Sequence, residues 1–291
     1  LYAQTGGACR ASNYVHLLRR ALDSAGFEQV RIFAINEQKD SEAEKLKLPF
    51  SVLWRSIMAL IYGDLLMRLS LRTRPYEVSK GETNALYAIW EEKIRDNIRN
   101  GKWALFKSNI KEMTEDFASV RIDDTPRPRV AVVGEILVKY HANANEHVID
   151  TIESEGGEAV ISDLSNFLMY CLSDNVYSYM KLNGNVLSSI FGQFGINIIE
   201  RMRAPVKEAL KGKRFGELDD INEMAAKCDG LVSLSNQAGE GWLLAAEMVG
   251  LIESGVNNIL CIQPFSCLPN HITGKGVIKE LKRVYQDANI L

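Results

Sequence analysis

The sequence predicts an α/β protein with two Rossmann-like domains, each built on a parallel sheet, and a helical block between them. Short apolar runs alternate with helical patterns after residue 126, which is typical of a parallel sheet. Residues 123–128 form a predicted linker, because two prolines and two acids fit neither a helix nor a sheet. We therefore place an N-terminal α/β unit plus helical block at 1–125, and a doubly wound α/β domain at 126–291.

The first half is expected to hold one α/β unit followed by helices. A glycine turn leads into a helix over residues 14–25, which Gly26 ends, and a strand follows at 30–34. Apolar residues then recur at helical spacing over three segments, residues 50–71, 83–100 and 102–120.

The second half is expected to alternate strands with helices. Strands are predicted at residues 129–133, 158–161, 229–233 and 258–262. Helices are predicted at residues 145–154, within the long zone 164–211, and at 217–227, 241–253 and 274–285. The chain starts without Met and its last residues have the pattern of a strand, so we expect an excised fragment of a longer chain.

Composition argues against several classes of function. The 291 residues carry a net charge of only -3 and no basic stripe interleaved with aromatic residues, so no nucleic acid partner is expected. Arg55, Asp64 and Arg68 interrupt the longest apolar stretch, so no membrane span is expected. Five cysteines without short paired spacing indicate reduced thiols and a cytoplasmic protein. Hydrolase chemistry has no support, because no Walker loop, nucleophile elbow or zinc-protease motif occurs.

Two cysteines occupy turns where a ligand-binding crevice is expected. Cys267 follows the predicted strand 258–262, and Cys9 lies in a glycine turn that leads into the first predicted helix. In open α/β sheets, ligands bind in the crevice beyond the carboxyl ends of the strands. These positions predict a shared thiolate site.

A third thiol, Cys171, completes the candidate set. Soft thiolates bind iron-sulfur clusters or zinc, and the ligands need not be adjacent in sequence. Cys171 lies in an apolar helical segment, so burial as a small hydrophobic residue is the alternative for it. Cys228 and Cys261 adjoin or lie within predicted apolar strands, which favours buried, unreactive thiols.

Polar residues at the predicted strand ends are candidates for lining the same site. Gln237 and Glu240 lie in a glycine-containing loop ahead of a helix, although a tight turn explains the same residues. Glu135 and His141 follow the first strand of the second domain, where helix capping is the preferred alternative. His271 becomes a candidate through its proximity to Cys267.

Four segments together resemble one known family. They are GGACRASNY (residues 6–14), VGEILVK (133–139), NQAGEGW (236–242) and QPFSCLPNH (263–271). In order and spacing they are similar to the C-terminal region of the large activase-related proteins of the 2-hydroxyacyl-CoA dehydratase superfamily, which belongs to anaerobic metabolism. The resemblance covers nearly the whole chain. One departure is Ser266, where the family pattern leads us to expect glycine.

The resemblance implies an iron-sulfur redox module. Its dehydratase and double-cubane subunits hold a four-iron four-sulfur type cluster through three cysteines, which would be Cys9, Cys171 and Cys267 here. An ATP-dependent activase supplies low-potential electrons, and here activase domains of the same longer chain would do so. A small-molecule substrate such as an acyl-CoA is implied for the superfamily. We expect such a cluster to be lost from a fragment prepared in air.

Other functions stay open at this stage. The sequence does not decide whether the chain is an enzyme, part of an ATP-dependent reductase or dehydratase system, or a cluster-free scaffold or docking domain. A zinc site built from the same thiolates is a third possibility.

Overall fold

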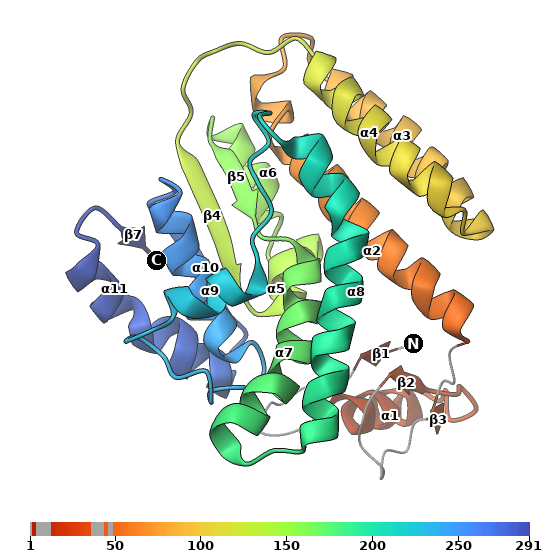
Figure 1. Ribbon diagram of the computed structural model, residues 1–291, viewed down its shortest axis with the longest axis vertical. Coiled ribbons are helices and arrows are strands. Elements are labelled where there is room, and N and C mark those ends of the chain that lie inside the picture. The colour runs from red at the N-terminus through yellow and green to blue at the C-terminus, as the bar shows by residue number, and fades with distance from the viewer. Residues whose placement is uncertain (1, 4–12, 36–43, 46–48) are drawn as a thin grey trace.

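The structure, a computed structural model, describes residues 2–3, 13–35, 44–45 and 49–291. It is a mixed α/β fold with two parallel sheets, which confirms the α/β class but not the two Rossmann-like domains predicted within it (Figure 1). One sheet has three short strands in the order β1-β2-β3, and the other has four strands in the order β5-β4-β6-β7.

The smaller sheet belongs to the N-terminal unit. Its strands are β1 (Tyr2–Ala3), β2 (Phe33–Ile35) and β3 (Glu44–Lys45), and α1 (Tyr14–Ser24) lies between the first two. Gly26 adopts a left-handed conformation with φ of 77°, which explains why the helix ends there. The strand predicted at 30–34 corresponds to β2, which begins three residues later, at Phe33, and ends at Ile35.

Three long helices form the helical block: α2 (Phe50–Leu71), α3 (Glu82–Asn100) and α4 (Trp103–Ser119). A short 3-10 turn, η2 (Arg74–Tyr76), follows α2, and Gly101 with φ of 64° separates α3 from α4. The core of the block holds Met58, Trp90 and Phe106, and Met202 of α8 (Val186–Leu210) packs into the same core. The helical block is therefore continuous with the second half of the chain.

Among the described residues, one segment is long and apolar enough to cross a membrane by length and composition. It comprises α2 and η2, with a mean hydropathy of 1.4 in its most apolar stretch. Core helices of globular proteins meet the same criterion, and Met58, Leu65 and Leu69 of α2 are buried in the helical core.

The larger sheet is the centre of the second half. Its strands are β4 (Arg129–Gly134), β5 (Glu158–Ile161), β6 (Asn258–Ile262) and β7 (Asn289–Ile290), and all neighbours are parallel. Val132 packs on one face against Leu71 and Ile152, whereas Ala131 on the other face joins a core that includes Trp242. Helices therefore cover both faces of the sheet, as the near-continuous apolar strands predict.

The helices of this half follow the sequence pattern with two refinements. They are α5 (Ile136–Tyr140), η3 (Ala142–Ala144), α6 (Val148–Ser154), α7 (Leu164–Leu182), α8, α9 (Ile221–Lys227), α10 (Gly241–Glu253), η4 (Asn270–Gly274), η5 (Lys275–Val277) and α11 (Ile278–Val284). The long helical zone is a hairpin, because Asn183 turns left-handed with φ of 56° and the Asn185 side chain accepts from the first amides of α8. The last predicted helix begins as irregular turns.

The predicted strand at 229–233 is wrong. This segment forms turns after α9, in which the amides of Leu231 and Val232 donate to the carbonyl of Cys228. Gly230 has φ of 79°, a conformation that no strand accommodates. β6 pairs directly with β4, so the loop at residues 233–242 follows a turn rather than a strand.

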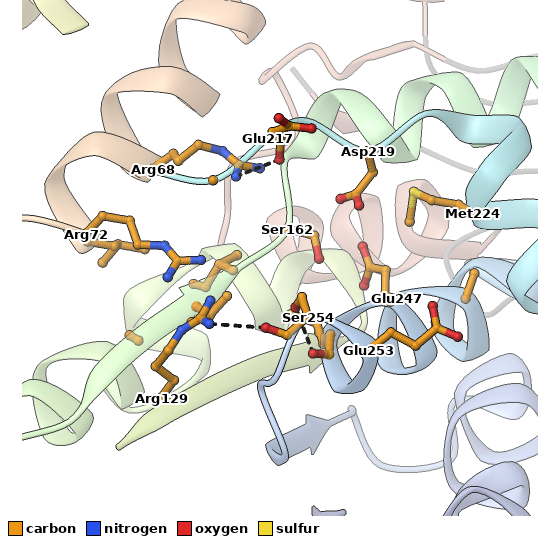
Figure 2. A pocket seen from close by; sticks show the side chains of 18 of the residues that line it. Arg68, Arg72, Arg129, Ser162, Glu217, Asp219, Met224, Glu247, Glu253 and Ser254 are labelled. Carbon is orange, nitrogen blue, oxygen red and sulfur yellow. Dashed lines mark hydrogen bonds between the residues drawn. The ribbon is translucent and has the colours of Figure 1, made fainter. Parts of the chain in front are cut away.

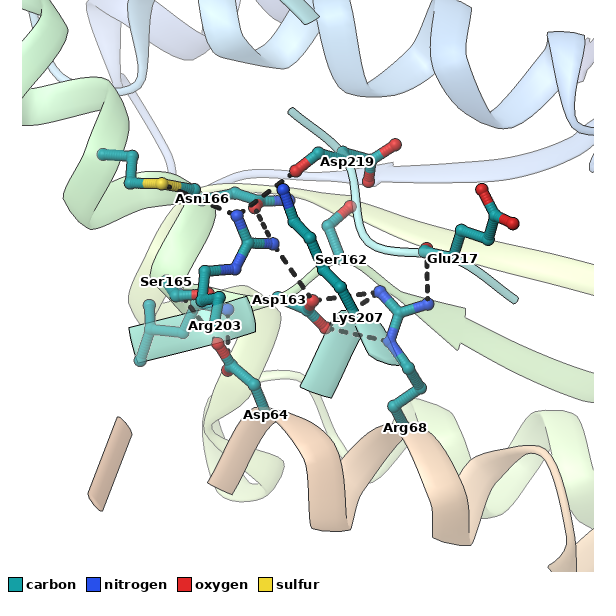
Figure 3. A network of polar contacts seen from close by, with 12 residues as sticks. Asp64, Arg68, Ser162, Asp163, Ser165, Asn166, Arg203, Lys207, Glu217 and Asp219 are labelled. Carbon is teal, nitrogen blue, oxygen red and sulfur yellow. Dashed lines mark hydrogen bonds and ion pairs between the residues drawn. The ribbon is translucent and has the colours of Figure 1, made fainter. Parts of the chain in front are cut away.

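A buried ion network joins α2 to the sheet (Figure 3). Asp163, between β5 and α7, accepts from Nε and Nη2 of the Arg68 guanidinium, with 3.0 Å from Nη2 to each carboxylate oxygen. Arg203 of α8 lies 3.7 Å from the same carboxylate. The Asp64 carboxylate accepts from the backbone amides of Leu164 and Ser165, each at 2.8 Å, and so caps the start of α7.

The two central strands approach closely where β4 ends. Gly134 has φ of 139°, and a Cβ placed there would lie 1.7 Å from the carbonyl oxygen of Ile262. Only glycine fits this position without moving one of the strands.

We predict that Gly134→Ala lowers the free energy of unfolding by about 2 kcal/mol or more, because the added methyl group meets backbone rather than a side chain. Urea unfolding measures the change. The matched control is Gly63→Ala in the middle of α2, where nothing lies within 4 Å, and it should be neutral or stabilising by up to about 1 kcal/mol. Equal effects of the two substitutions would contradict this account.

Candidate functional site

The candidate site is the crevice at the carboxyl ends of β4 and β6. The chain leaves β4 toward β5 on one side, and β6 lies on the other side of β4. The loops that follow these two strands therefore diverge, and such a switch point is where parallel α/β sheets bind their ligands. We name this region the switch-point crevice. Residues 135–141 and 263–271 follow its two strands.

Cys267 is buried in the loop after β6, with 5% of its surface exposed. The Asn270 side-chain amide donates to its Sγ over 3.2 Å. Ser266, directly before it, adopts a left-handed conformation with φ of 59°. That conformation favours glycine, so the glycine expected from the family resemblance has a physical basis here.

Glu240 connects three segments at the crevice. Its Oε2 accepts from the Asn270 amide at 2.7 Å, and its Oε1 accepts from the backbone amide of Ile136 at 3.3 Å. Burial raises the pKa of Glu240, and the nearby negative charge of Glu135 raises it further. Glu135 itself caps α5 by accepting from the amide of Val138 at 2.9 Å. Glu240 therefore holds the loop of Cys267 against the first turn of α5.

A second polar group, formed by Tyr170, Asp174 and Trp242, adjoins Glu240. The rings of Tyr170 and Trp242 meet edge to face with 5.2 Å between their centroids. The Tyr170 hydroxyl lies against the start of α10, because a Cβ at Gly241 would be 2.4 Å from it. The buried Tyr170 hydroxyl and Trp242 indole nitrogen face the Asp174 carboxyl group, although none of these contacts has the geometry of a well-aligned hydrogen bond. The three groups thus form a buried polar cluster.

The pKa of the Asp174 carboxyl group lies far above its ordinary value. Burial raises its pKa from 3.8 to about 8, against the smaller opposing effects of the Tyr170 hydroxyl and the Trp242 indole. The carboxyl group is therefore protonated over much of the neutral range and can act as a hydrogen-bond donor.

Cys171 lies beside Tyr170 on α7 and is exposed. Burial is the main reason why the pKa of Tyr170 is raised. The negative charge of a Cys171 thiolate would raise that pKa further. The alternative of a buried hydrophobic thiol is therefore wrong for Cys171. Hydrogen bonds join Cys267 and Glu240 to Asn270, and the charge of Glu240 raises the pKa of Tyr170, so the loop of Cys267 lies near the segment of α7 that carries Cys171.

The remaining predicted residues differ in their placement. His271 Nδ1 lies 2.7 Å from the carbonyl oxygen of Cys267, so it stays within the cysteine loop. The side chain of Gln237 accepts from the Ser178 hydroxyl at 2.6 Å and joins its loop to α7. His141 is exposed at the end of α5. Asn145 accepts from the amide of Val148 at the start of α6, which is the capping role predicted for this turn.

Cys9, the third predicted ligand, lies outside the described residues. Within the described part, no group of three or more His, Cys, Asp or Glu side chains is placed to hold a metal ion. Burial raises the pKa of Cys228 to about 12 and that of Cys261 to about 11. Both thiols therefore stay protonated at neutral pH, as expected for structural cysteines.

Sequence reasoning missed Asn270, Tyr170, Asp174 and Trp242. Asn270 was detectable, because it lies three residues after Cys267 where a local side chain reaches the sulfur. Asp174 stands three residues after Cys171, which puts both near one face of a helix. The pairing of Tyr170 with Trp242 depends on how α7 packs against α10, and no local pattern encodes it.

Comparisons of the chain with protein-family models, with curated proteins and with solved structures found no match. The function is therefore inferred from the site.

We predict that Asp174 makes the protein less stable as the pH rises. Its folded-state pKa of about 8 lies above the ordinary value of 3.8, so the folded state keeps a proton that the unfolded state releases. The resulting stability is fully present below about pH 4 and is lost as the pH rises through about 8. Asp174→Asn should be more stable than the wild type at pH 8 and should show a flatter pH profile.

Thermal unfolding between pH 5 and pH 9 measures this difference, with Asp124→Asn in the exposed linker as the control. The control should keep the wild-type profile. An Asp174→Asn profile parallel to that of the wild type would show that the carboxyl group ionises normally.

Proposed function

We propose that this chain is an iron-sulfur redox module with a four-iron four-sulfur type cluster in the switch-point crevice, held by Cys9, Cys171 and Cys267. One observation carries the proposal. Cys267 lies in the loop at the switch point with a side-chain amide directed at its sulfur, and Cys171 is exposed on the helix that borders the same crevice. The four motif segments that resemble the dehydratase superfamily support the same assignment.

The described residues around Cys267 suit a cluster chemically. Hydrogen bonds to cluster sulfurs tune the reduction potential, and the Asn270 amide already donates to Sγ. The Tyr170 hydroxyl and the Trp242 indole are further buried donors, and both face Asp174. Burial raises the pKa of Glu240 and raises that of Asp174 to about 8, which reduces the negative charge that these carboxyl groups would add to the thiolates.

When bound, a cluster held by three cysteines supplies single electrons and leaves one iron without a protein ligand. The chain's own residues would then position a substrate and a proton. Asp174 holds a proton at Oδ1 or Oδ2 near pH 7, since its pKa is about 8. The Tyr170 hydroxyl and the Trp242 N–H face Asp174 and would orient its carboxyl group. Glu240, hydrogen-bonded to Asn270 and Ile136, keeps the cysteine loop closed over the crevice.

We also propose the wider setting of this module. ATP-dependent activase domains of the same longer chain would deliver the electrons, and an acyl-CoA thioester is the substrate class that the resemblance suggests. The module would work in the cytoplasm, where thiols stay reduced. The small parallel sheet of β1, β2 and β3 supports a Rossmann-like N-terminal domain beside the larger one.

A cluster-free docking domain is the second candidate, and a specific surface favours it. Apolar side chains are exposed along the α7–α8 hairpin, with Phe191 72%, Phe194 61%, Ile190 59% and Met180 63% exposed. Such a surface is typical of protein contacts. A docking role does not require any of the cysteines.

Anaerobic reconstitution with iron and sulfide tests the cluster directly. We expect the wild-type chain to take up both elements, and Cys9→Ala, Cys171→Ala and Cys267→Ala each to lose most of this uptake. Cys228→Ala and Cys261→Ala are the matched controls and should retain it, because their thiols are buried and protonated.

Absence of specific iron and sulfide uptake by the wild type would overturn the proposal in favour of the docking domain. Zinc retained through the same three thiols after native purification would instead identify a zinc site.

A further inference from the structure

A second cavity lies away from the cysteines, beside the edge strand β5. It has a volume of about 480 Å³ and is enclosed by α2, β5, the segment between α8 and α9, and α10 (Figure 2). Residues of β5 and of α10 line it along much of their length. A cavity of this volume accommodates a small organic molecule.

The charges in this cavity are separated. Figure 2 shows the side chains of Arg68, Arg72 and Arg129 on one side and those of Asp219 and Glu253 on the other. Apolar residues also contribute to the wall, among them Val160, Met224 and Leu251. Lys227 also lines the cavity and pairs with Glu253 at 3.1 Å. A ligand in the cavity would therefore meet a basic end and, on the opposite side, the carboxylate of Asp219.

At the basic end, positive charge exceeds negative charge. Arg72 and Arg129 share the single carboxylate of Glu158, and the contact from Arg129 Nε is 3.3 Å long. That Nε is buried and forms no hydrogen bond of good geometry. Burial, with the like charges of Arg129 and Arg68, lowers the pKa of Arg72. Two guanidinium groups thus compete for one counter-ion.

Arg214 adds a third cation at the same end. Its Nη2 donates to neutral acceptors, the hydroxyl of Thr73 at 3.2 Å and the carbonyl of Phe117 at 2.8 Å. No ion pair with a carboxylate is found for it among the described side chains. Arg214 is an exposed residue of the cavity lining, and the partial desolvation of its guanidinium lowers its pKa.

We propose that this cavity binds a small organic anion, whose phosphate or carboxylate group is held by Arg72, Arg129 and Arg214. The planar guanidinium groups offer paired donors that match the oxygens of either group. The acidic end, near Asp219, selects a hydrogen-bond donor or a positive charge on the far side of the same molecule. This site is separate from the switch-point crevice and does not depend on a cluster.

Titration calorimetry with inorganic phosphate tests the proposal, with the ionic strength held constant by chloride. A parallel titration with acetate distinguishes the two oxyanions. We expect saturable binding of at least one of them. Arg129→Gln and Arg214→Gln should each weaken it about tenfold, the effect of losing one charged hydrogen bond. Arg283→Gln on the exposed face of α11 is the charge control and should bind as the wild type does.

A second variant keeps every charge in place. Gly250 of α10 lines the cavity, and the nearest atom to a Cβ there is the flexible amine of Lys227 at 3.4 Å. Gly250→Leu would narrow the cavity and weaken anion binding, whereas Gly250→Ala should bind nearly normally. Both substitutions favour a helix. The proposal would be overturned if neither phosphate nor acetate showed saturable binding at constant ionic strength. It would also be overturned if Gly250→Leu left the binding unchanged.

Discussion

The ion network around Asp163 is the constraint on which the rest of the structure depends. Arg68 of α2 and Arg203 of α8 meet this carboxylate where β5 ends and α7 begins, and the side chain of Asp64 caps the first amides of α7. Breaking one member of a buried ion pair costs several kcal/mol, about 3–5, so the arrangement is rigid. The network thereby fixes the start of the helix that carries Tyr170 and Cys171 to the crevice, and it joins the helical block to the sheet.

A second constraint acts at the other side of the crevice. The contact of Gly134 with Ile262 brings β4 and β6 together at their carboxyl ends, and the loops beyond them must diverge. Glu240 then ties the loop of Cys267 to the first turn of α5 through Asn270. Burial raises the pKa values of Glu240 and Asp174 and so favours their neutral forms. Less negative charge near the crevice makes it better suited to thiolates.

Much of the fold follows from local patterns, whereas the site follows from packing. The bounds of α2, β5 and β6 agree with the periodicity and punctuation of the sequence. The segment at 229–233 misled because Leu231 and Val232 have the apolar character of a strand, whereas the flanking Gly230 with φ of 79° places them in turns that are only partly buried. Helical periodicity does not decide which side of α7 is covered, and so the exposure of Cys171 could not be predicted. Nor does any local signal bring Trp242 against Tyr170.

Anomalous diffraction at the iron edge from anaerobically reconstituted crystals tests the central claim most directly. The account predicts an iron signal in the switch-point crevice, within bonding distance of the sulfur atoms of Cys171 and Cys267. It also predicts that Asn270 still donates to the Cys267 sulfur. A crevice without iron signal in chains that carry stoichiometric iron would contradict the account, as would iron bound at other residues.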